Sequence, residues 1–124
     1  MLTRPFDDPM EKQTFSRDAR IRKKRDYSTV YQQGVRKDTR HFIVIARPSR
    51  SGFSRLGVTV SKKAGGAVTR NRVKRLLREF FRLHQRQFIP AQDIVIIAKR
   101  NMPALTYQDV RGELEGLIAK TSDA

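Results

Sequence analysis

The sequence predicts an α+β domain, a two-layer α/β sandwich in which helices pack on a small sheet. The chain has 124 residues, which suffices for one domain that buries a core of its own. Short runs rich in β-branched residues are typical of strands, and they lie at 41–46, 55–61 and 93–100. Apolar residues at helical spacing precede, separate and follow these runs, which gives the order helix, strand, strand, helix, strand, helix.

The first half of the chain is expected to form one helix and two strands. The helix lies at about 26–33, where Tyr27, Val30 and Tyr31 recur at helical spacing and Gly34 is a suitable stop. The segment PSRSGFS separates the first two strands, and its Pro, Ser and Gly residues predict a hairpin loop.

The second half is expected to form a long helix, a buried strand and a last helix. The long helix lies at about 68–88, after the turn KKAGGAV and before Pro90. The run DIVIIAKR at 93–100 is continuously apolar at its start, which predicts a strand buried on both faces. Thr106 with Asp109 three residues later is an N-cap pattern for the last helix. The inner face of that helix is expected to hold Val110, Leu114, Leu117 and Ile118.

Positive charge is concentrated in the middle of the chain. The formal net charge is +15, and residues 17–100 alone hold 23 basic residues against five acidic ones. The flanking segments 1–16 and 101–124 are mildly acidic. A basic region between acidic ends is typical of a protein that binds a polyanion, most often nucleic acid.

The ends and the composition give the domain organisation and the compartment. Residues 1–16 contain two prolines and little periodicity, which predicts a flexible tail before a single RNA-binding domain at 17–124. The chain has no cysteine, so it has neither a disulfide nor a thiolate metal site. It shows no apolar run long enough to span a membrane and no signal peptide, so we expect a cytoplasmic protein without a membrane partner.

The long helix separates into an apolar face and a basic face when it is drawn at 100° per residue. Val73, Leu77 and Phe80 lie on the apolar face. The opposite face holds Asn71, Lys74, Arg75, Arg78, Arg82 and Arg86, with Arg72 at the margin. Glu79 is the one acidic residue against seven basic ones between positions 70 and 86. Solvated faces usually mix both signs, so this imbalance favours binding of nucleic-acid phosphates, which arginine contacts with a planar fork.

The stretch SKKAGGAVTRNRVKRLLREFFR at 61–82 closely resembles the signature of the protein subunit of bacterial ribonuclease P, which is built around an Arg-Asn-Arg helix. The resemblance extends to LGVTV before it, to DIVIIAK after it and to the first helix with its two aromatic residues, and it covers about 20–120. Gly66 stands where that family often has asparagine. The resemblance implies a mainly antiparallel sheet of about four strands, of the ribosomal protein S5 domain 2-like type, with a left-handed βαβ crossover. A fourth short strand is then expected near 35–38.

The resemblance also implies a function. In this family an RNA subunit is the catalyst, and it uses Mg²⁺ to hydrolyse the phosphodiester that joins the 5′ leader to precursor tRNA. The protein itself has no catalytic residue, metal or bound cofactor; it holds the leader in a cleft between its first helix and the sheet. The residues expected to face the catalytic RNA are Lys62, Lys63, Arg70, Asn71, Arg72, Lys74, Arg75 and Arg78. Those expected to face the leader are Tyr27 and Tyr31, with Arg40 and Phe42 as weaker members.

The strand at 55–61, which we place at the centre of the sheet, supports the predicted cleft. Alternation along a strand gives Leu56, Val58 and Val60 one face and leaves Gly57, Thr59 and Ser61 on the other. A face of small polar residues can admit an extended chain of nucleotides.

Two other functions compete with this one. A structural RNA-binding protein of the ribosomal type would explain the basic helix but would not require aromatic residues beside the basic run RIRKKR, an arrangement typical of single-strand binding. Tyr27 and Tyr31 also fit a role in the core. A protein nuclease would need a carboxylate cluster for metal, whereas the acidic residues of 17–100 are scattered and His41 and His84 have no acidic neighbours in sequence.

Overall fold

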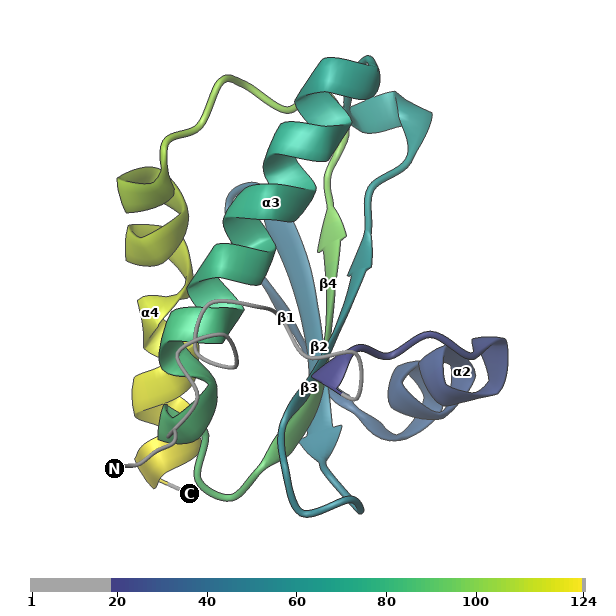
Figure 1. Ribbon diagram of the computed structural model, residues 1–124, viewed down its shortest axis with the longest axis vertical. Coiled ribbons are helices and arrows are strands. Elements are labelled where there is room, and N and C mark those ends of the chain that lie inside the picture. The colour runs from purple at the N-terminus through teal and green to yellow at the C-terminus, as the bar shows by residue number, and fades with distance from the viewer. Residues whose placement is uncertain (1–18, 124) are drawn as a thin grey trace, which may run out of the picture.

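The computed structural model describes residues 19–123, with side chains described through Gly116. The tail predicted at 1–16 and the side chains of Leu117 and Ile118 lie outside this description. The elements in chain order are α2 (Lys24–Gln33), β1 (Val35–Asp38), β2 (Phe42–Pro48), β3 (Arg55–Thr59), α3 (Ala67–His84), β4 (Gln92–Ala98) and α4 (Tyr107–Asp123) (Figure 1). Two short 3₁₀ turns, η2 (Lys62–Ala64) and η3 (Gln85–Gln87), flank α3.

The strands form one mixed sheet in the order β1-β2-β4-β3. β1 with β2 and β2 with β4 are antiparallel, whereas β3 and β4 are parallel and are connected through α3. The fourth strand expected near 35–38 is β1. The α+β class and the four-stranded sheet are therefore confirmed, while the left-handed sense of the β3–α3–β4 crossover stays a prediction.

The hairpin predicted between the first two long strands is wrong. β4 lies between them, so that Ala46 of β2 and Leu56 of β3 both pair with Ile94. β3 is consequently an edge strand rather than the central one, and its outer side meets only an isolated bridge at Arg20 among the described residues. The physical reason is that β4 is the most apolar strand, and the position with a neighbour on each side buries it best.

Helices cover both faces of the sheet (Figure 1). α3 and α4 lie together on one face, where Phe42, Ile94 and Leu77 belong to the larger core. α2 lies on the other face, where Val30 and Val95 belong to a smaller core. Neighbouring residues of β4 thus enter different cores, which confirms the prediction of a strand buried on both faces.

The helices begin and pack much as their patterns predict. α3 buries Val73, Leu77, Phe80 and Phe81. At the start of α4, the backbone N–H of Asp109 donates to the Thr106 hydroxyl at 3.2 Å, and the Thr106 N–H donates to the Asp109 carboxylate at 2.9 Å. This reciprocal pair is the predicted N-cap.

Candidate nucleic-acid interface

Tyr27 of α2 packs its ring against the backbone of β3 at Gly57. A Cβ atom placed on Gly57 would lie 2.8 Å from Cε1 of Tyr27 and 2.9 Å from its hydroxyl oxygen. Real Cβ atoms essentially never come this close to another heavy atom, so the ring needs a glycine beneath it. Burial raises the pKa of the Tyr27 phenol, and a hydrogen bond with the backbone of Val58 offsets part of that rise. The predicted small-residue face of β3 is therefore the surface on which Tyr27 lies.

Tyr31 lies one helical turn further on, with its ring centroid 6.3 Å from that of Tyr27 and 44% of its surface exposed. On the opposite flank of α2, Asp26 pairs with Arg55 at 3.7 Å. Five residues along a helix correspond to a rotation of about 140°, so Tyr31 faces away from that ion pair. Tyr31 therefore presents an exposed ring beside Tyr27.

On the same face of the sheet as α2, Thr59, Ile97 and Ile43 form a strip across three strands, and both isoleucines pack against the smaller core. The three residues are in register, because Ile97 pairs with Thr59 on one side and with Ile43 on the other. All three are only partly buried. We call them the open strip. Tyr27 and Tyr31 are called the aromatic wall, and the wall together with the open strip is called the groove; it combines two aromatic rings with one threonine and two isoleucines.

The two weaker members of the predicted leader-facing set, Arg40 and Phe42, differ in their exposure to solvent. Arg40 is exposed in the turn before β2, beyond the Ile43 end of the open strip. Phe42 has no exposed surface and belongs to the core beneath α3 and α4. The prediction for Phe42 is wrong, because a buried ring on the far face of the sheet cannot stack on a base. Strand alternation would have selected its neighbour Ile43, which sequence reasoning missed.

The basic residues predicted to face RNA lie on η2 and the first three turns of α3. Lys62, Lys63, Asn71 and Arg75 are exposed, and Arg70, Lys74 and Arg78 are partly buried. The backbone N–H of Asn101 donates to the Lys63 carbonyl at 2.9 Å, which fixes η2 beside the end of β4. We call this set, together with Arg72, the basic surface.

Arg72 differs from the rest of the basic surface because it supports the fold. Its Nε and Nη2 atoms donate to the Leu105 carbonyl oxygen at 3.2 and 2.9 Å. This fork connects α3 to the segment that precedes α4. A guanidinium has five N–H donors, so Arg72 keeps donors for a phosphate while it holds Leu105.

Arg78 is a partly buried member of the basic surface. Burial lowers the pKa of the Arg78 guanidinium and the charge of Arg20 lowers it further, whereas Tyr27 acts in the opposite direction. α3, which carries Arg78, and α2, which carries Tyr27, lie on opposite faces of the sheet (Figure 1).

A buried ion network holds the other flank of α2. Asp93 is 1% exposed and accepts two hydrogen bonds from Arg55, from Nε and Nη2, each at 2.9 Å. Arg47 lies 3.9 Å from the same carboxylate, and Arg55 reaches on to Asp26 of α2. Because Asp26 adjoins Tyr27, this network positions the aromatic wall of the groove.

An acid–base pair lies apart from the groove, at the β1–β2 turn. Nδ1 of His41 is 2.8 Å from Oε1 of Glu113, and Oε2 of Glu113 accepts from the His41 backbone N–H at 2.6 Å and from the Thr39 hydroxyl. Burial by itself would raise the pKa of Glu113, but the hydrogen bonds from Thr39 and His41 outweigh it and lower the pKa. The pair fastens α4 to the sheet; sequence reasoning missed it because its members are 72 residues apart.

The described residues show neither a cluster of metal-ligating side chains nor a membrane-spanning helix. Within residues 19–116, no three His, Asp or Glu side chains are grouped so that they could hold a metal ion. None of the helices in the described part of the chain is long and apolar enough to cross a membrane.

Comparisons with known proteins show the family of the chain. Residues 15–122 match the family model described as Ribonuclease P. The chain is 50% identical over 111 residues to the ribonuclease P protein component of Syntrophus aciditrophicus, covering 90% of this chain and 93% of that protein. It is 41% identical over 99 residues to the same component of Staphylococcus haemolyticus, covering 80% and 86%.

Solved structures show the same fold. A mutant RNase P protein of Staphylococcus aureus matches with a TM-score of 0.75 at 35% identity, covering 95% of this chain and 98% of that one. The RNase P protein of Thermotoga maritima matches with a TM-score of 0.72 at 30% identity, covering 82% and 96%.

Proposed function

The chain belongs to the ribonuclease P protein family, and on this premise we propose that it is the non-catalytic subunit of an RNA-based endoribonuclease. The chain acts as a protein subunit in the maturation of tRNA 5′ ends. In our proposal the catalytic RNA carries out the hydrolysis and holds the Mg²⁺ that it uses. The protein contributes binding, and it works in the cytoplasm.

We assign the basic surface to the catalytic RNA. All of its members except Asn71 carry positive charge and none is acidic, and arginine and lysine bind phosphates whatever the base sequence. Glu79, the acidic residue of α3, is paired with Arg82 at 2.8 Å and leaves the basic surface uncompensated.

We assign the groove to the 5′ leader of precursor tRNA. The observation that carries this proposal is the position of Tyr27 on Gly57, with Tyr31 exposed beside it and the open strip alongside. Two aromatic rings beside partly exposed strand residues suit an extended single strand, whose bases stack on the rings. In this proposal one RNA complex occupies both surfaces, and Arg40 extends the groove at its far end.

A structural RNA-binding protein of the ribosomal type remains the competing function. It would use the basic surface, but the groove would have no occupant. The exposed ring of Tyr31 beside partly uncovered Ile43 and Ile97 favours the ribonuclease P role.

Reconstitution separates the two functions. The purified protein is mixed with a bacterial ribonuclease P RNA at a magnesium concentration too low for the RNA alone, and precursor tRNA is added. We expect cleavage at the mature 5′ end in the mixture and none with either component alone. Failure of the protein to restore cleavage, with the RNA active at high magnesium, would contradict the proposal.

A further inference from the structure

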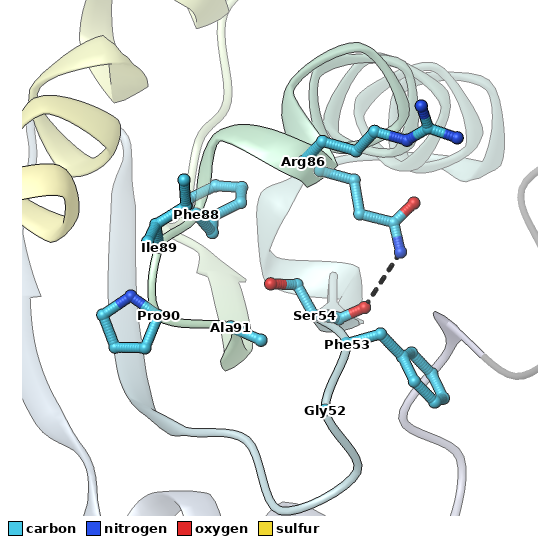
Figure 2. A pocket seen from close by; sticks show the side chains of 9 residues that line it. Gly52, Phe53, Ser54, Arg86, Phe88, Ile89, Pro90 and Ala91 are labelled. Atoms are coloured by element: carbon cyan, nitrogen blue, oxygen red, sulfur yellow. Dashed lines mark hydrogen bonds between the residues drawn. The ribbon is translucent and has the colours of Figure 1, made fainter.

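A pocket lies at the end of α3 opposite to the basic surface (Figure 2). Its volume is about 460 Å³, within the range of small-molecule sites. The loop between β2 and β3 forms one side, and the segment from η3 to β4 forms the other. The lining residues are Gly52, Phe53, Ser54, Gln85, Arg86, Phe88, Ile89, Pro90 and Ala91.

Hydrogen bonds hold the two sides of the pocket in place. The Gln85 side-chain amide donates to the Ser54 carbonyl at 3.1 Å, drawn as a dashed line in Figure 2. The Ser54 hydroxyl in turn accepts from the backbone N–H of Gln92 at 3.0 Å. Phe88 is buried and stacks on Phe81 with ring centroids 5.9 Å apart, which fixes the base of the apolar side. The pocket is therefore preformed.

The lining combines exposed apolar surface with a single charge. Ile89 is 66% exposed and Phe53 is 41% exposed, values that are high for large apolar residues. Arg86 is exposed at the rim, and no acidic residue is present among the nine that line the pocket. Asp93, two residues after Ala91 in sequence, is buried and already bound by Arg55. The field at the pocket is consequently positive.

We propose that this pocket binds one unstacked nucleotide of an RNA, with the base between the two sides and the phosphate at Arg86. A base has flat apolar faces that suit Ile89 and Pro90, and its polar edge suits the partly exposed carboxamide of Gln85. Charge complementarity favours a nucleotide over an apolar peptide, because the rim is cationic on a chain of net charge +15.

The pocket is distinct from both proposed RNA surfaces. The basic surface ends on α3 at Arg78, and the pocket lies past the C-terminal end of that helix; eight residues at 1.5 Å per residue separate Arg78 from Arg86 by roughly 12 Å along the axis. A nucleotide bound there would be a third RNA contact of the protein. It would come from a part of an RNA that neither the groove nor the basic surface contacts.

Titrations of the isolated protein test the site directly. Adenosine 5′-monophosphate, adenosine and ribose 5-phosphate are each added, and backbone amide shifts are followed by NMR. We expect the monophosphate to bind more tightly than adenosine and to shift the amides of Ser54, Arg86 and Ile89, with ribose 5-phosphate weakest. Monophosphate shifts confined to the groove, or none at all, would overturn the proposal.

Variants separate the base contact from the phosphate contact. In Arg86→Gln, the affinity for the monophosphate should fall about three- to tenfold, to the level of adenosine. In Ile89→Ala, both affinities should fall together. Leu83→Ala, which alters an exposed apolar residue of α3 outside the pocket, and Arg111→Gln on α4 should change neither. Equal losses in the Leu83 or Arg111 controls would contradict a site at the pocket.

Cross-linking then tests the assembled complex. The chain has no cysteine, so Ser51→Cys in the β2–β3 loop can carry a single photoreactive aryl azide, and Val68→Cys at the start of α3 can carry it as a control. We expect both to cross-link RNA, and addition of Ile89→Ala to abolish only the cross-link from position 51. Absence of any RNA cross-link from position 51, with the control working, would refute the third contact. Nucleotide binding by the isolated protein does not depend on the ribonuclease P role, so the two proposals fail separately.

Discussion

The ring of Tyr27 lies so close to Gly57 that a single added methyl group on the strand would stand 2.8 Å from it. The two residues are 30 positions apart and belong to different elements, and their contact sets where the aromatic wall of the groove stands. A change at Gly57 therefore alters the groove without touching the basic surface.

Gly57→Ala should weaken the binding of precursor tRNA by the assembled holoenzyme. The new Cβ displaces the Tyr27 ring from the strand, so the ring no longer lies where a base can stack on it. Binding of mature tRNA, which has no leader, should be unchanged. The measurement is the affinity for each tRNA at fixed salt.

The matched control for Gly57 is Gly112→Ala. Gly112 is exposed on α4 and a Cβ there would meet nothing within 4 Å. This change should leave both affinities unaltered. It should stabilise the protein by about 0.5–1 kcal/mol, because alanine has a higher helix propensity than glycine. Unchanged precursor binding in Gly57→Ala would mean that the ring position does not matter for the leader.

Arg75 and Arg72 should behave differently when each is replaced by alanine. Arg75→Ala removes one phosphate contact, so the slope of log affinity for the catalytic RNA against log salt should fall by roughly 0.7–0.9, with no change in stability. Arg72→Ala removes both hydrogen bonds to the Leu105 carbonyl oxygen, so it should also lower the free energy of unfolding by about 1–2 kcal/mol. Salt titrations and urea unfolding measure the two effects; a stable Arg72→Ala protein would contradict the anchoring role.

Glu113→Gln should destabilise the protein at neutral pH and not in acid. The pKa of Glu113 is lower in the folded protein than the usual 4.5, so its contribution to stability is complete above pH 4.5 and is lost as the pH falls through the folded value. The stability difference between wild type and variant should thus be largest near neutrality and shrink below pH 4.5.

The control for Glu113 is Glu115→Gln, two residues along the same helix. Glu115 pairs with Arg111 on the exposed side of α4, and such exposed ion pairs contribute about 0.2–1 kcal/mol to the free energy of unfolding. Urea unfolding of both variants from pH 3 to 8 gives the comparison. A pH-independent loss in Glu113→Gln would show that packing, rather than the carboxylate, fastens α4.

Much of this fold follows from local patterns. The apolar stripe of α3, the continuous run of β4 and the Thr106 cap each have one simple structural solution, and the structure adopts it. Strand order is different, because turn residues between β2 and β3 mark a change of direction but not a partner. The preference of β4 for two neighbours decides the order, and it acts between segments that are far apart in sequence.

The candidate site also combines features that local sequence patterns predict with features that depend on contacts between distant residues. Spacing alone places Tyr27 and Tyr31 on one helix face, and it places Lys74, Arg75 and Arg78 on the polar face of α3. The other members of the basic surface, and Phe42, were implied by the family resemblance, and the alternation of β2 assigns Phe42 to the core instead. The contacts of Arg72 with Leu105 and of His41 with Glu113 join residues 33 and 72 positions apart, and composition carries no signal for such pairs.

Tyr27→Ala is the change that tests the proposed leader groove most directly. The holoenzyme is assembled with wild type, Tyr27→Ala and Tyr27→Phe, and its affinities for precursor and mature tRNA are measured at fixed salt. Loss of one stacking platform costs about 1–3 kcal/mol per base, so Tyr27→Ala should bind precursor tRNA about 5- to 150-fold more weakly, while assembly and mature tRNA binding stay normal. Tyr27→Phe keeps the ring and should retain most of the precursor affinity. Equal losses for both tRNAs would contradict the account, because Tyr27 would then support the fold rather than hold the leader.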